Sequence, residues 1–256
     1  MKLPTIDAYA FPVVVPSTGK QIAMRPFLVR EEKLLLMAQE SQNVNEQVEA
    51  VAQVIRNCVN LPDMDPRKIP YFDAEYLLLQ LRIRSVGEIV EPIYQCNNLI
   101  PSSAGDPAPC GNKMKLRINL TDVKVENIPT STDAMTIVIS PAYTLKLRYP
   151  SIYTIQALLP VVTEDGNAPS SIAAMDNIHE ILDTLLDVEK DVLYQFSDNT
   201  PEERIAFLDS LEPTAYKKIV DFIANIPSVS HTVTHVCDKC QFEHTIRFKG
   251  MSDFLL

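Results

Sequence analysis

The stretch SHTVTHVCDKCQFEHTIRFK, residues 230–249, decides the fold, because two alternating β-strand patterns flank a tight Cys-Asp-Lys-Cys turn. In a hairpin of this kind, the turn places the thiols of Cys237 and Cys240 on the same side of the tip. Two thiols supply half of a tetrahedral zinc site. A second pair of ligands must then come from another part of the chain.

Cys96 and Cys110 form such a second pair. They bracket a loop rich in Asn, Pro, Ser and Gly, and strand patterns lie on both sides, in EIVEPIYQ (residues 88–95) and KMKLRINL (residues 113–120). The two thiols converge if these flanking strands pair and the loop bulges outward. We therefore predict one structural Zn²⁺ site, which joins the C-terminal part of the chain to its middle, with the ligands Cys96, Cys110, Cys237 and Cys240.

Two histidines leave the ligand set open. His235 and His244 flank the tight turn, and together with Cys237 and Cys240 they would make a local site that needs nothing from the first hairpin. A site without metal and a disulfide also remain possible. His235 shares a strand face with Cys237, so it is alternatively a hydrogen-bond donor behind a ligand. A site of four thiolates is closed to water and substrate, and its metal contributes folding stability rather than catalysis.

The composition restricts the function. The chain has 256 residues, a net charge of −10 and a pI of about 4.9, which argues against binding to nucleic acid. We see neither a signal peptide nor a segment long enough to span a bilayer, so we expect synthesis and residence in a reducing cytosol. In that compartment, paired cysteines bind metal more often than they form disulfides. Cys58 follows a helical pattern, and we interpret it as a buried apolar side chain.

The pattern of elements predicts an α+β protein. Its first part is a strand-rich body, residues 1–125 and 228–256, that carries the zinc-ribbon-like pair of cysteine-tipped hairpins. We expect this body to begin with a hairpin around the turn PSTGK, residues 16–20, and to continue with three helices. Asp73 is predicted to cap the third of these helices. The apolar block Leu34–Met37 in the first helix is expected to be buried on more than one side.

The second part, residues 126–227, is predicted to be a β-hairpin followed by a helical insert. Within it, SIAAMDNIHEILDTLLDVEKDVLYQFSD (residues 171–198) has apolar residues at helical spacing with acidic residues between them, which indicates one long amphipathic helix. Thr200, Pro201 and Glu203 form a helix start with a capping box. A last helix is expected in residues 213–226.

Enzyme motifs are missing from the sequence. It contains no Gly-rich phosphate loop, no Gly-x-Ser-x-Gly and no His-Glu-x-x-His. We therefore predict that the protein is not an enzyme, and a zinc-dependent hydrolase remains as the alternative from another functional class.

Three features resemble a known family: the segment MRPFLVREEKLLLMA (residues 24–38), the segment FDAEYLLLQLRIRSVGE (residues 72–88) and the paired cysteines. The family is that of the baseplate proteins of T-even-like contractile-tailed bacteriophages (myoviruses), which includes the hub component and the hub-assembly factor. The resemblance implies a structural component of the tail baseplate, at or near the hub, that acts through protein–protein contacts in tail assembly. It leaves open a transient hub-assembly chaperone that does not stay in the virion.

The resemblance also implies the partners and the location. The partners are other phage baseplate and tail proteins in a hetero-oligomeric assembly, with no nucleic acid, membrane or small-molecule substrate. The location is the tail baseplate of the virion, after synthesis in the host cytoplasm. Two surfaces suit such contacts: the strands of the N-terminal hairpin, which can extend a neighbour's sheet, and the tail Phe254-Leu255-Leu256. This tail either docks into a partner or packs on its own domain.

Overall fold

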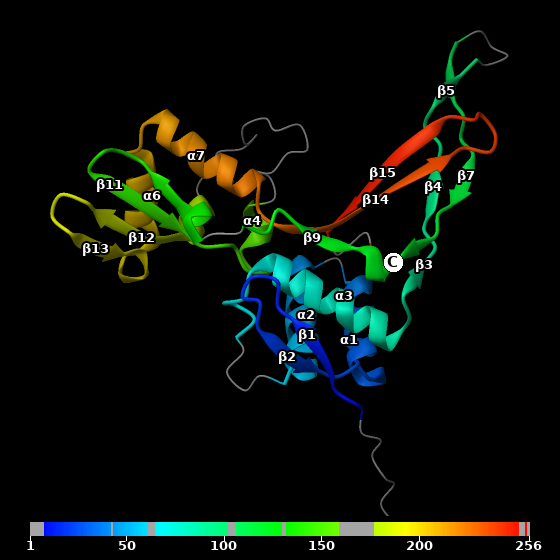
Figure 1. The fold of residues 1–256 in the computed structure, drawn as a ribbon, viewed down its shortest axis with the longest axis horizontal. Helices are drawn as coiled ribbons and strands as arrows, with labels where there is room; N and C mark the ends of the chain where they lie inside the picture. Colours follow the sequence, from blue (N-terminus) through cyan, green and yellow to red (C-terminus); the bar gives the residue numbers. More distant parts are fainter. Residues whose placement is uncertain are drawn as a thin grey trace, which may run out of the picture.

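A computed structural model describes residues 8–41, 43–60, 65–101, 106–129, 132–158, 177–250 and 254. It is an α+β fold, as predicted, in three parts (Figure 1). A helical base contains α1 (Val29–Glu40), α2 (Val44–Cys58), α3 (Tyr71–Ser85) and the hairpin of β1 (Phe11–Val14) and β2 (Gln21–Met24). An arm of paired strands projects from one side of this base, and a sheet covered by helices lies on the other.

The arm consists of short antiparallel pairs. Its elements are β3 (Ile89–Val90), β4 (Ile93–Gln95), β5 (Leu99–Ile100), β6 (Ala108–Pro109), β7 (Lys113–Lys115), β8 (Ile118–Asn119), β9 (Lys124–Glu126), β14 (Ser228–Val236) and β15 (Glu243–Lys249). β3 pairs with β8, β4 with β7 and β5 with β6, while β14 lies between β15 and β9. The two cysteine-bearing hairpins of the sequence therefore lie side by side in the arm (Figure 1).

The third part is the sheet unit, an antiparallel sheet with helices on one face. It contains β10 (Thr136–Val138), β11 (Tyr143–Leu147), β12 (Leu182–Asp187), β13 (Val192–Gln195), α4 (Ile155–Leu158), α6 (Pro201–Asp209) and α7 (Pro213–Ala224). The strand order is β10-β11-β12-β13, so β10 and β13 are the edges. The capping box of α6 is present as predicted, because Thr200 accepts from the backbone N–H of Glu203 and Glu203 accepts from that of Thr200.

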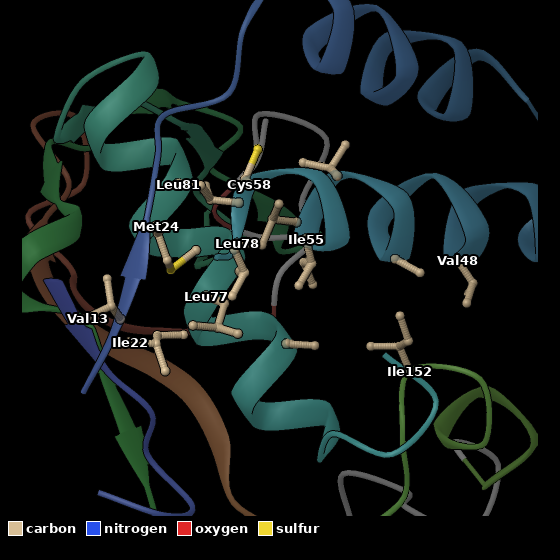
Figure 2. Close-up of a cluster of buried hydrophobic side chains, with 14 residues drawn as sticks. Val13, Ile22, Met24, Val48, Ile55, Cys58, Leu77, Leu78, Leu81 and Ile152 are labelled. Carbon is tan, nitrogen blue, oxygen red and sulfur yellow. The ribbon is translucent and has the colours of Figure 1, made fainter. Parts of the chain in front are cut away.

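The core of the base forms where the N-terminal hairpin packs on α2 and α3 (Figure 2). The hairpin turns at Gly19, whose φ of 66° is one that glycine adopts without strain. Full burial of each large aliphatic side chain stabilises such a core by about 1.5–3 kcal/mol. Cys58 is buried in this cluster, which confirms its interpretation as an apolar core residue.

Two expectations for the helices of the base are wrong. Leu36 and Met37 on α1 are 52% and 65% exposed, so the apolar block of this helix is buried on one side only. Asp73 does not cap α3, which begins at Tyr71 after Pro70. The Asp73 carboxylate instead accepts hydrogen bonds from the backbone N–H (2.9 Å) and the hydroxyl of Ser17, and it thereby holds the hairpin turn against α3.

The predicted long helix of residues 171–198 is also wrong where the structure describes it. From residue 177 onward, this segment forms a 3₁₀ turn (Asn177–Ile181) and the hairpin β12–β13. The reason is that β11 pairs with β12 along its whole length, with one irregularity between Lys146 and Leu147. In the turn, the buried Asp187 accepts from the backbone N–H (3.1 Å) and the ammonium group (2.8 Å) of Lys190. The acidic residues of this segment therefore do not form one solvated helix face, and Ile172 and Met175 lie outside the described residues.

An aromatic row connects the base with the sheet unit. Phe72 of α3 is fully buried and contacts Tyr149 edge to face, with 5.1 Å between ring centroids. Tyr149 in turn stacks on Phe222 of α7 at 5.5 Å. Phe72 thus belongs to the core cluster of the sheet unit although it lies on a helix of the base.

The described part of the C-terminal tail packs on its own chain. Phe254 is buried in a cluster at the foot of the arm with Leu120 and Val229, which is the second of the two alternatives for this tail. Leu255 and Leu256 lie outside the described residues. Among the described helices, none combines the length and the apolar character needed to cross a bilayer.

A buried carboxylate in the base gives a pH prediction. Burial by itself raises the pKa of Glu31, but hydrogen bonds from Arg25, Arg30 and the backbone N–H of Leu28 outweigh it and lower the pKa to about 2. Since the pKa is lower in the folded state than its ordinary value of 4.5, this carboxylate stabilises the fold above pH 4.5 and loses its contribution as the pH falls toward 2.

We expect Glu31→Gln to lower the free energy of unfolding by about 2–3 kcal/mol at neutral pH. The difference from the parent protein should shrink as the pH falls through the window below 4.5. Urea unfolding of both proteins at several pH values measures it, and Glu32→Gln, an exposed neighbour, is the matched control. A difference that stays constant with pH would contradict this role of Glu31.

Candidate metal centre

The tight turn of the second hairpin holds two of the predicted ligands. β14 and β15 pair from Ser230↔Lys249 to Val236↔Glu243, so the ladder ends next to Cys237. The Cys237 N–H donates to the carbonyl of Phe242 at 2.8 Å, and the Gln241 N–H donates to the carbonyl of Cys237 at 2.8 Å. These backbone bonds close the turn and bring the thiols of Cys237 and Cys240 to one side of it.

The first hairpin presents its thiols in the middle of its ladder. β4 and β7 pair up to Gln95↔Lys113, and the next backbone bonds run from the Cys96 N–H to Asn112 O (2.8 Å) and from the Gly111 N–H to Cys96 O (3.0 Å). Gly111 has a φ of 69°, which an L side chain rarely adopts. The chain can thus bend there and set Cys110 opposite Cys96 while β5–β6 continues beyond them.

The structure brings all four predicted cysteines together. Their sulfur atoms lie within 4.8 Å of one another, and two contacts between the hairpins measure 3.6 Å, from Cys96 to Cys240, and 3.9 Å, from Cys110 to Cys237. A tetrahedral ion with Zn–S bonds of about 2.3 Å requires sulfurs about 3.8 Å apart. A disulfide requires about 2.05 Å, and all four thiols are free. The spacing therefore fits a thiolate-bound ion.

Polar groups around the cluster favour thiolates at some positions and thiols at others. The backbone N–H groups of Cys240 and Lys239, with the amide of Asn112 3.5 Å from the sulfur, lower the pKa of Cys237 to about 6 against the effect of burial. Burial raises the pKa of Cys96 to about 12. A divalent cation among the sulfurs would remove the cost of burying the remaining negative charges.

One histidine contacts the cluster, and it is His244. Its Nε2 atom lies 3.1 Å from the sulfur of Cys96, and its ring packs edge to face against Tyr94 and Phe242. Sequence reasoning had singled out His235 as the donor behind the ligands. His235 and His244 are direct partners in the ladder and lie on the same face of the hairpin. The sequence therefore predicts the correct face but the wrong histidine. In the described part of the chain, the group with metal-site spacing contains the four cysteines and no histidine.

The arrangement is suited to holding an ion rather than to catalysis. Cys96, Cys110 and Cys237 are buried, and Cys240 is half-buried. Four sulfurs complete a tetrahedral shell and leave no position for water or substrate. An ion held by these four sulfurs would join two hairpins whose cysteines are separated by 127 and 144 positions in the sequence.

In a comparison with protein families, the chain matches the family model described as "T4 bacteriophage base plate protein" over residues 8–256. No match was found among curated proteins or solved structures.

Proposed function

The chain belongs to the family of T4 bacteriophage base plate proteins, and from this premise we propose that it is a hub or hub-proximal structural subunit of a contractile tail. The observation that carries the proposal is the extent of the match, which covers almost the whole chain, both cysteine pairs included. In this role the protein acts through contacts with other tail proteins in a hetero-oligomeric assembly and catalyses no reaction.

A structural Zn²⁺ is part of the proposal. Cys96, Cys110, Cys237 and Cys240 would hold it, and the ion would fix the two hairpins of the arm as one rigid projection. Support comes from the spacing of the sulfurs, which fits a tetrahedral thiolate site. The same closed donor set disfavours the alternative of a zinc-dependent hydrolase, whose metal needs an open position.

We also propose a division of the chain into two domains. Residues 1–125 and 228–256 form a body that carries the arm, and residues 126–227 form an insert. The strand register supports this division, because β9, which ends at the first residue of the insert, pairs with the start of β14, immediately after the insert. The chain thus leaves the body at β9 and returns to the neighbouring strand.

The test of the proposed function is made on mature particles of the phage that encodes this chain. We expect quantitative mass spectrometry to find the polypeptide at a constant ratio to other baseplate proteins. An amber mutation in its gene should yield tails without complete baseplates. If the protein is required for assembly but missing from mature particles, the transient chaperone is the correct function. If tails assemble normally without it, the proposed function is wrong.

A further inference from the structure

A groove of about 680 Å³ opens on the sheet unit between the sheet, α6, the α6–α7 connection and the first turn of α7. Its apolar and aromatic lining includes Tyr143, Leu185, Tyr194, Phe207 and Leu211. The volume lies within the range of binding pockets, about 300–1,000 Å³. The groove is remote from the cysteines, which are in the arm on the opposite side of the base (Figure 1).

The groove continues the core of the sheet unit to the surface of the described residues. Leu185 and Tyr194 are partners in the β12–β13 ladder, so both side chains point to the same face of the sheet. Leu185, Phe207 and Leu211 pack against the buried cluster of the sheet unit but stay partly exposed. Apolar area of this kind gains about 25 cal/mol per Å² when a partner covers it.

The edge strand beside the groove is open to pairing. On the opposite edge of the sheet, the Lys218 ammonium of α7 donates to the Val138 carbonyl of β10 at 2.8 Å. β13 has the sequence Val-Leu-Tyr-Gln, all four residues are exposed, and none is Lys or Pro, the residues that protect natural edges. A strand added to β13 directs alternate side chains to the face that carries Tyr194 and therefore the groove.

The charged side chains that line the groove are acidic, although Lys190 lies near its tyrosines Tyr143 and Tyr194. The charged residues among those lining it are Glu203 and Glu212, and the first turn of α6 adds the exposed Glu202. No Lys, Arg or His belongs to the described lining. A second copy of this acidic chain would bring like charges together, whereas a segment with Lys or Arg beside its apolar residues would be attracted.

We propose that this groove and the β13 edge bind an extended segment of another tail protein, in which an apolar anchor is flanked by Lys or Arg. The anchor fills the groove above Leu185 and Leu211, the backbone of the segment extends the sheet at β13, and the cations meet Glu212 and Glu203. The inference rests on the proposed function for the source of the partner, and on the geometry above for its chemistry.

The experiment uses the full-length protein and an array of overlapping synthetic peptides that span the other tail proteins of the same phage. We expect it to retain peptides that combine apolar residues with Lys or Arg. Tyr194→Ser and Glu212→Lys should each weaken binding of the strongest peptide by about tenfold in fluorescence anisotropy. Replacing the Lys and Arg of that peptide by Glu should abolish binding.

Matched control variants test whether a loss of peptide binding comes from the groove or from a general change in the protein. Val138→Ser changes an apolar residue of similar exposure, 58% against 47% for Tyr194, on β10, the opposite edge strand of the sheet. Glu32→Lys makes the same charge change as Glu212→Lys, in the first turn of α1 on the base. Both should bind like the parent protein, and all variants should melt within a few degrees of it.

Two results would overturn the inference: no peptide retained by the parent protein, or peptides retained equally by the parent and Tyr194→Ser. Either result leaves the particle experiment untouched, so the groove can fail while the baseplate function stands. If instead the polypeptide is dispensable for tail assembly but the peptides bind as expected, the recognition chemistry holds and the assigned role fails.

Discussion

Cys237→Ser is expected to give protein that is insoluble or rapidly cleaved by protease and that lacks the zinc ion we propose. Structural zinc sites contribute about 10–16 kcal/mol of apparent binding energy. Whole domains are stable by only about 5–15 kcal/mol. Removal of one of four sulfurs would weaken binding of the proposed ion and leave two buried thiols and the half-buried Cys240 with no common partner. Limited proteolysis, thermal melting and elemental analysis of the purified protein measure the outcome.

The matched control is Cys58→Ser, the same atomic change at a cysteine that is also buried but lies in the core of the base. It should retain one zinc ion per chain and lose about 1–2 kcal/mol of stability. Chelation of the metal from the parent protein should reproduce the protease sensitivity of Cys237→Ser. Equal melting temperatures for the parent, Cys237→Ser and the chelated protein would show that no metal supports the arm.

Phe72→Ala is expected to cost about 3–5 kcal/mol of unfolding free energy. The ring is fully buried, and its edge-to-face contact with Tyr149 is the first link in the row that reaches Phe222. Its loss leaves a cavity between the base and the sheet unit, which neither part can close without moving. Urea unfolding followed by circular dichroism gives the magnitude.

Tyr9→Ala serves as the control for Phe72→Ala, because Tyr9 is 93% exposed and its loss should change stability by less than about 0.5 kcal/mol. We also expect the transition of Phe72→Ala to broaden or split, since the sheet unit then unfolds more independently of the base. A cost below 1 kcal/mol for Phe72→Ala would mean that this aromatic row does not couple the two parts.

The cluster of four cysteines could be predicted from the sequence because its geometry is local on each side. Period-two alternation on both sides of Cys237 and Cys240 specifies a hairpin, and a hairpin fixes which side its tip residues face. The convergence of the two hairpins was a chemical inference from the number of thiols. The sequence could not decide between His235 and His244 as the histidine that contacts the cluster. The two are cross-strand partners, and the side-chain conformations near Cys96 decide which one makes the contact.

Errors occurred where a distant segment decides the local structure. The run from Leu182 to Asp187 has apolar residues at spacings that suit both a helix and a buried strand, and only the presence of β11 selects the strand. Asp73 is a good capping residue by its type, but Ser17, 56 positions earlier, recruits its carboxylate. The exposed Leu36 and Met37 lack a covering surface among the described residues of this chain, and apolarity alone does not reveal that.

The pairing of Cys96 with Cys240 across 144 positions also sets an order of events during translation. At about 5–20 residues per second, a ribosome adds the last of these thiols roughly seven to thirty seconds after the first. Throughout that interval the nascent polypeptide carries half of a binding site. Completion of the arm is therefore one of the last steps in the biogenesis of each molecule. A chain released before Cys240 is synthesised never completes its arm.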